Sequence, residues 1–200
     1  MSVRRDYAGY RLRMGTRYSS RLRLEPIGPQ RADDLWLLHQ DDGIAYWYGG
    51  RWTHQAAAET AAMMERGWRV DGVHKWIAYR RTTGELVGRG GLSYGDVAGV
   101  RRLELGWAVR GPFRGQGYAT EIGRAGLRFA FHELNAEDVV AFTERHHHRS
   151  RAVMERLGMR PIGELRRPGL VDGRDGVHDD APFVLYRAAR TSHRVRGTSP

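Results

Sequence analysis

The segment Phe113–Glu121, which reads F-R-G-Q-G-Y-A-T-E, has the residues of an anion-binding turn. It follows a strand-like run, Arg102–Val109, and it opens a helix-like run that reaches about His132. A glycine-rich turn between a strand and a helix presents backbone N–H groups, and the helix dipole adds partial positive charge there. Because Gly115 and Gly117 have no Cβ, a phosphate can approach this backbone closely. The segment matches neither the P-loop nor the G-x-G-x-x-G pattern, so we predict a phosphate-binding turn of another kind.

A candidate general base lies in the strand-like run before this turn. Strand alternation sends Glu104 to the face opposite Leu103 and Leu105. A carboxylate there can accept a proton from an aliphatic ammonium, whose pKa is near ~10.4, once desolvation raises the pKa of the carboxylate. A solvent-facing strand glutamate without a role is the alternative interpretation, and the residue types alone do not separate the two.

The spacing Arg114-x-x-Gly117-x-Ala119 resembles the acyl-CoA pyrophosphate loop of the GCN5-related N-acetyltransferase (GNAT) family. The preceding strand and the downstream run Ser150–Met159, S-R-A-V-M-E-R-L-G-M, stand where that family has them. The likeness covers roughly residues 22–190 and is greatest to ribosomal-protein N-terminal acetyltransferases and their small-molecule relatives. It implies acetyl-CoA as co-substrate, no metal, and a primary amine of a small molecule or a protein N-terminus as acceptor. It further implies direct attack in a ternary complex, and dimerisation is common among such relatives.

The same resemblance implies a set of site residues. The catalytic base would be Glu104, in an E-x-G pattern like that of the family. The strand before the turn would pair through its backbone with pantetheine, and an N–H of Ala108 or Val109 would stabilise the oxyanion. The expected coenzyme-binding residues are Trp107, Ala108, Val109, Arg114, Gly115, Gln116, Gly117, Tyr118 and Ala119.

The helix that follows departs from the family pattern. Relatives often carry N-x-x-S or N-x-x-A and then a tyrosine that protonates the leaving thiolate. Here His147 takes the Asn position, Ser150 matches the Ser, and Met154 stands near the place of the Tyr. A methionine cannot donate a proton, so Ser150 is the predicted donor, and His147 is a second candidate as donor or base. The three histidines His146–His148 point in different directions at a helix start, which argues against one shared metal ion.

The elements that must position these residues can be read from periodicity and turn signals. We expect strands at Ser20–Glu25, Lys75–Arg80, Glu85–Tyr94, Arg102–Arg110, Asp138–Phe142, Met159–Leu165 and Phe183–Arg190. Helices are expected at Arg31–His39, Thr53–Val70, Gly115–His132 and Arg149–Leu157, with Gly43–Trp52 irregular and Arg166–Asp180 a polar loop. This order predicts a single α/β (α+β) domain with a mixed, mostly antiparallel sheet flanked by helices. By resemblance, the sheet splays open between its fourth and fifth strands.

The acceptor is not specified by the sequence. The aromatic residues Tyr46, Trp47, Tyr48 and Trp52 fit either core packing or the lining of an acceptor pocket. A local acidic patch that attracts cationic amines is a further expectation, built from Asp33, Asp34, Asp41, Asp42, Asp179 and Asp180.

Composition limits the remaining classes of function. Two hundred residues suit one domain, and the absence of cysteine excludes disulfides and thiolate metal sites. No apolar run approaches the ~18 residues that a membrane span needs, and no signal-peptide core is present. We therefore expect a cytoplasmic protein with no membrane partner.

The net charge of +10 is concentrated near the two ends of the chain. We assign residues 1–18 and 191–200 to basic tails and residues 19–190 to the acetyltransferase domain, and the tails would contact polyanions nonspecifically. Two alternative functions stay open at this point: a nucleic-acid or ribosome-binding protein that uses its tails, and an acyl-CoA-binding sensor without catalysis.

Overall fold

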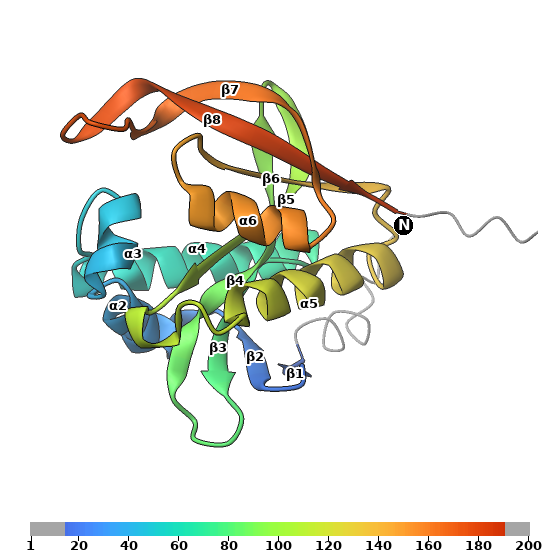
Figure 1. Cartoon of the computed structure of the whole chain (residues 1–200). Helices are drawn as coiled ribbons and strands as arrows, with labels where there is room; N and C mark the ends of the chain where they lie inside the picture. The colour runs from blue at the N-terminus through green and yellow to red at the C-terminus, as the bar shows by residue number, and fades with distance from the viewer. Residues whose placement is uncertain (1–14, 191–200) are drawn as a thin grey trace, which may run out of the picture.

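The computed structural model describes residues 15–190, which form one eight-stranded sheet flanked by helices (Figure 1). The strands are Arg17–Tyr18 (β1), Leu22–Pro26 (β2), Lys75–Arg80 (β3), Leu86–Val97 (β4), Val100–Val109 (β5), Asp138–Glu144 (β6), Arg160–Leu170 (β7) and Val177–Ala189 (β8). The helices are Ala32–Leu38 (α2), Asp42–Trp47 (α3), His54–Asp71 (α4), Tyr118–His132 (α5) and His148–Arg156 (α6), with 3-10 turns at Pro29–Arg31 (η1) and Gly111–Phe113 (η2).

The sheet has the order β1-β2-β3-β4-β5-β6-β8-β7, and every neighbouring pair is antiparallel except β5 and β6. This confirms the predicted fold class. The parallel pair is joined at the single register position Glu104↔Val140, whereas β4 and β5 pair along their whole length. Among the described strands, none pairs with the edge of β5 after Glu104 on that side, and this is the opening expected between the fourth and fifth predicted strands.

The two faces of the sheet carry separate cores. One core packs α2, α3 and α4 against β3 and β5, with Leu35, Ile44, Met64, Ile77 and Ala108 among its members. The other packs α5 against the opposite face, where Leu103 and Leu105 of β5 meet Ile122 and Phe129. Helices α5 and α6 lie side by side (Figure 1), and a Cβ on Gly123 would come within 2.4 Å of Leu157 Cδ1. Glycine at this position lets the Leu157 side chain pack directly on the α5 backbone.

Two predicted segments are wrong. Gly43–Trp52 was expected to be irregular, but residues Asp42–Trp47 form α3. The carboxylate of Asp41 caps this helix by accepting the N–H of Ile44 at 3.2 Å, and Ile44 and Ala45 are buried beneath it. Capping and burial together outweigh the low helix propensity of Gly43.

The segment Arg166–Asp180, expected to be a polar loop, is mostly strand. β7 continues to Leu170 and β8 starts at Val177, so only residues 171–176 connect them. The ring of Phe183 packs over Gly169, and Arg167 lies 4.3 Å from the centre of the Phe142 ring. Apolar and cation–π contacts thus support strand pairing that the polar composition conceals.

The predicted tails lie largely outside the described residues. Arg17 and Tyr18 of the first tail form β1, which pairs with β2. Among the described helices, none has the length and apolar character required to traverse a bilayer.

Candidate active site

A groove of about 2060 Å³ opens where β5 and β6 part. This exceeds the ~300–1,000 Å³ of a typical small-molecule pocket, so a long co-substrate and an acceptor can lie in it together. Every site residue predicted from the sequence lines it: Glu104, Trp107, Ala108, Val109, Arg114, Gly115, Gln116, Gly117, Tyr118, Ala119, His147 and Ser150. The groove therefore brings together residues that come from β5, from the turn before α5, and from α6.

The turn before α5 has the backbone of an anion cradle. Gly115 and Gly117 have φ of +75° and +82°, a region that favours glycine, and Gly117 is the N-cap of α5. No side chain caps this helix, so its first N–H groups are open to a ligand. The position of a Cβ on Gly115 has no heavy atom within 4 Å. The predicted phosphate-binding turn thus has both open donors and open space.

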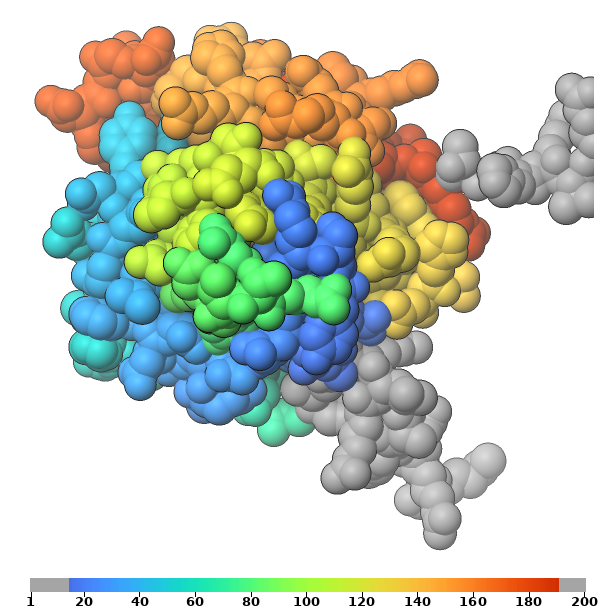
Figure 2. All heavy atoms as spheres, turned by 60° about the horizontal axis from the view of Figure 1, so that its bottom comes forward, coloured from blue at the N-terminus to red at the C-terminus, as the bar shows by residue number. Residues whose placement is uncertain are grey.

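The acidic residue in the first turn of α5 is neutralised by its neighbours. Glu121 accepts hydrogen bonds from Ser19 Oγ (2.7 Å), Ser20 Oγ (3.0 Å) and the backbone N–H of Arg21 (2.8 Å), and it pairs with the Arg21 guanidinium. Burial raises the pKa of this carboxyl, but these hydrogen bonds outweigh it and lower the pKa overall. Arg21 also donates to the carbonyl of Gln116 at 3.0 Å. In Figure 2 the dark-blue segment that carries these residues lies against the yellow-green turn.

Arg114, the first residue of the motif, is held away from the turn. Its guanidinium pairs with the Asp41 carboxylate and donates from Nε to the carbonyl of Val109 at 3.0 Å. Asp41 also accepts the N–H of Gly111 at 2.7 Å. Burial raises the pKa of the Asp41 carboxyl, and the Gly111 N–H and Arg114 lower it overall. Arg114 therefore fixes the start of α3 to the end of β5.

Glu104 lies on the sheet face opposite the α5 core, as strand alternation predicts, and is half-buried. Lys75 approaches it from β3, and its Nζ donates to the carbonyl oxygens of Gly91 (3.0 Å) and Glu104 (3.4 Å). Burial lowers the pKa of Lys75 to about 8, an effect that the Glu104 carboxylate opposes and the Arg89 guanidinium reinforces. The carboxylate thus has a buried cationic neighbour, and the sequence motif gave no sign of this neighbour.

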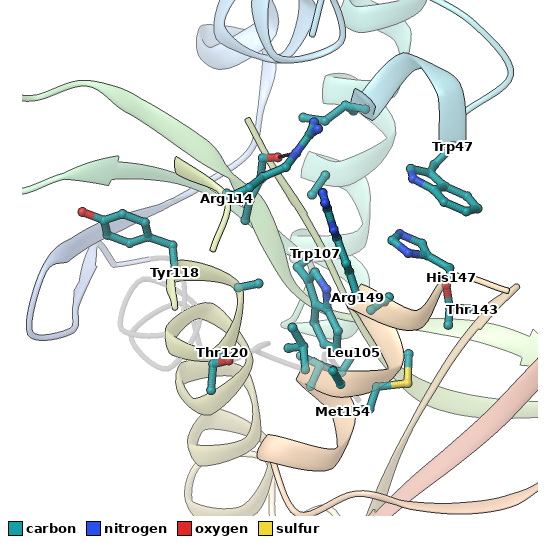
Figure 3. A pocket seen from close by; sticks show the side chains of 18 of the residues that line it. Trp47, Leu105, Trp107, Arg114, Tyr118, Thr120, Thr143, His147, Arg149 and Met154 are labelled. Carbon is teal, nitrogen blue, oxygen red and sulfur yellow. Dashed lines mark hydrogen bonds between the residues drawn. The ribbon is translucent and has the colours of Figure 1, made fainter. Parts of the chain in front are cut away.

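The α6 side of the groove holds the candidate proton donors. The ring of His147 stacks on Trp47 of α3, with 3.8 Å between centroids and 4° between planes (Figure 3). Burial lowers the pKa of His147 to about 4, and His146, Arg149 and Arg114 add to this, so its imidazole is neutral near pH 7. The buried thioether of Met154 lines the same wall.

The aromatic residues expected either in the core or in the lining of an acceptor pocket divide between two places. Tyr46, Trp47 and Tyr48 line the groove, whereas Trp52 stacks on His39 instead. No member of the six-aspartate patch lines it, so the acidic patch expected for cationic amines is absent from the groove. Four arginines of α5 and α6 also line it and form no ion pair within residues 15–190: Arg124, Arg128, Arg149 and Arg156. Positive charge in the groove suits a polyphosphate ligand.

The chain is similar to known proteins in sequence and in fold. Residues 21–160 match the profile described as "Acetyltransferase (GNAT) domain". The uncharacterized protein YkkB of Bacillus subtilis is 28% identical over 66% of this chain and 76% of its own length. The FsC-acetyl coenzyme A-N(2)-transacetylase of Aspergillus fumigatus is 29% identical over 72% of this chain and 64% of its own length.

Solved structures share the fold at lower identity. A GNAT-family acetyltransferase from Bordetella pertussis superposes with a TM-score of 0.74 at 23% identity, over 88% of this chain and 99% of the other. The ribosomal-protein-S5-alanine acetyltransferase from Vibrio fischeri gives a TM-score of 0.72 at 11% identity, over 89% and 98%.

Proposed function

Because the chain belongs to the GNAT acetyltransferase family, we propose that it transfers the acetyl group of acetyl-CoA to a primary amine within a ternary complex. The observation that carries this proposal is the groove itself, which joins an uncapped, glycine-lined helix N-terminus to a half-buried strand carboxylate. The first part suits a pyrophosphate, and the second suits deprotonation of an ammonium.

In the proposed reaction the coenzyme lies along the open edge of β5. The N–H groups at the start of α5 and the unpaired arginines of the groove hold its phosphates. Of the two predicted donors, the backbone N–H of Val109 faces the open edge, because the N–H of Arg110 and hence that of Ala108 point toward β4, and Val109 stabilises the negative charge on the thioester oxygen. Arg114, engaged by Asp41 and Val109, braces the end of this strand, and it would have to turn to reach a phosphate.

The chemical step needs a proton acceptor for the amine and a proton donor for the thiolate. Glu104 accepts a proton from the ammonium, and the free amine attacks the thioester carbonyl carbon, so that an N–C bond forms and the C–S bond breaks. The departing thiolate takes a proton from Ser150, and the second proton, which the nitrogen loses as the amide forms, restores the Ser150 hydroxyl through solvent water. His147 is the weaker candidate, because its imidazole is neutral at pH 7 and one of its faces is covered by Trp47. Met154 has no proton to give.

The nucleic-acid-binding alternative is not favoured, because the groove and the family membership account for the described residues without it. A sensor that binds acyl-CoA without turnover differs from the proposed enzyme in one measurable respect, which is thiol release in the presence of amines.

Calorimetry with acetyl-CoA, together with an assay of thiol release over a panel of amines, tests the proposal. In Gly117→Glu the new carboxylate would lie in the anion cradle and would strain a φ of +82°, so we expect coenzyme binding to be lost. Gly84→Glu is the matched control, because Gly84 has a φ of +73° with open space around it and lies in the β3–β4 turn, outside the groove. Equal loss of binding in both variants would contradict the assignment of the turn, and binding without thiol release would support the sensor.

A further inference from the structure

Two buried cationic side chains, those of Arg89 and Lys75, form a cationic surface on the sheet face that carries Glu104. The register aligns Arg89 of β4 with Ala108 of β5, and Lys75 of β3 with Gly91 and then Gly106. Neighbouring same-face positions along a strand are about 6.6 Å apart, so Arg89, Lys75 and Glu104 follow one another along this face. Two cations and one carboxylate thus lie within a few residues of the open edge of β5.

Within residues 15–190, Arg89 has no anionic partner. The residue is 6% exposed, and the only hydrogen bond of its guanidinium there runs from Nε to Nε2 of His39 at 3.4 Å. His39 cannot supply the missing charge, since burial lowers its pKa to about 3 and leaves it neutral. Its Nδ1 is also buried without a partner. Burying a guanidinium without an anion is costly, so an unpaired buried arginine beside a groove points to an anionic ligand.

The groove reaches this surface at Gly106 and Tyr48, both of which line it. A Cβ on Gly106 would lie 3.3 Å from Lys75 Nζ and 3.7 Å from Glu104 Oε1, so the absent side chain leaves a space between an ammonium and a carboxylate. The ring of Tyr48 lies over Arg89, 4.8 Å from Cζ to the ring centre, and Tyr48 is 41% exposed. Arg89 and Lys75 do not line the groove themselves, and Tyr48 separates the guanidinium from it, so a ligand reaches Arg89 only when the exposed Tyr48 ring turns aside.

Building on the proposed acetyl transfer, we propose that the acceptor is an amino acid whose carboxylate binds Arg89 while its amine lies over Gly106 beside Glu104. The carboxylate of an amino acid suits the cations Arg89 and Lys75, and its amine, a few bonds away, comes within reach of the Glu104 carboxylate. A polyamine has no group for Arg89, and the expected acidic patch does not line the groove. A protein N-terminus presents a neutral peptide carbonyl in place of the carboxylate.

The test uses the full chain with acetyl-CoA and compares the twenty amino acids with their carboxamides by thiol release. We expect at least one amino acid to exceed its own amide by about 10- to 100-fold in kcat/KM, the worth of one charge-assisted hydrogen-bond pair. Arg89→Gln should remove this preference by lowering activity toward the acid while activity toward the amide is kept. Arg89→Lys should keep part of the preference. Arg102→Gln is the control, because Arg102 is a β5 arginine already paired with Asp138 (3.1 Å) and outside the groove.

Melting temperature and acetyl-CoA affinity, measured on each variant, separate misfolding from loss of recognition. If Arg89→Gln does not fold, the preference of the wild type for acids over amides, and the reduction of this preference in Arg89→Lys, still test the role of Arg89. Turnover of amides and simple amines without a preference for acids overturns this inference and leaves acetyl transfer standing. Binding of acetyl-CoA with no turnover of any amine overturns both.

Discussion

Lys75 is the only lysine of the chain, and replacing it with methionine should stabilise the protein at neutral pH. Burial lowers its pKa from 10.5 to about 8, which means that the fold disfavours the charged form by ~3 kcal/mol. Methionine removes this penalty with a side chain of similar length. The lost hydrogen bond to the Gly91 carbonyl offsets ~1 kcal/mol of the gain. We therefore expect the free energy of unfolding of Lys75→Met to exceed that of the wild type by ~2 kcal/mol at pH 7.

The stability advantage of Lys75→Met over the wild type should vanish as the pH rises. Between pH about 8 and 10.5 the unfolded lysine keeps its proton while the folded one has lost it, so the unfolded state binds more protons. The stability of the wild type consequently rises with pH through this window, and the variant has no such contribution. Near pH 10.5 the wild type should equal or exceed the variant, because its hydrogen bond remains without the charge.

Urea unfolding of both proteins at pH 7 and pH 10 measures the double difference, in which tyrosines and other shared titrating groups cancel. Because the chain has a single lysine, a nuclear magnetic resonance titration of its Nζ gives the pKa independently. The reasoning is refuted if the variant has the same advantage at both pH values, or if the lysine titrates near 10.5.

Three further outcomes follow from the site. Glu104→Gln should lower kcat by about 10²–10⁴-fold at neutral pH with acetyl-CoA affinity kept, and a wild-type rate would remove it from the role of base. Asp41→Ala should lower the free energy of unfolding by ~1–2 kcal/mol, because it removes the α3 cap and the pair with Arg114, and a urea titration measures this. Burial lowers the pKa of His39 from 6.5 to about 3. As the pH falls below 6.5, His39 therefore binds a proton in the unfolded state but not in the folded state, and the free energy of unfolding decreases. Between pH 7 and pH 5 the free energy of unfolding of His39→Gln should therefore fall by ~1–2 kcal/mol less than that of the wild type. If the free energies of both proteins fall equally, another group controls the pH dependence.

Local signals predicted the elements that carry the phosphate-binding turn. Gly115 and Gly117 mark the turn because their positive φ angles are a local requirement, and Thr53 caps α4 through Ala56 as its residue type predicts. The α3 helix was missed although Asp41 stands at its N-cap, because aromatic residues and Gly43 mask the short apolar pair buried beneath it. That signal was present in the sequence and was outweighed.

The acceptor side could not be predicted in the same way, because its contacts join distant segments. The stacking of Trp47 on His147 links α3 to the start of α6, and the type of either residue does not indicate that the other is its partner. The meeting of Lys75, Arg89 and Glu104 depends on the register of three strands, and a one-residue slip would send any of them to the opposite face. Sequence periodicity fixes which residues share a face of one strand, and leaves open which residues of other strands lie beside them.

The E-x-G pattern of Glu104 and Gly106 acquires a physical meaning from this register. Residues two apart on a strand share a face, so the pattern places a carboxylate and an empty position side by side on one face of the sheet. Any side chain at Gly106 would meet the ammonium of Lys75 at 3.3 Å and fill the space in which an amine could approach the carboxylate. In the proposed acetyl transfer the glycine serves access rather than backbone freedom, because its φ is not among the positive values. On that proposal, the motif supplies both the base and the room for its substrate.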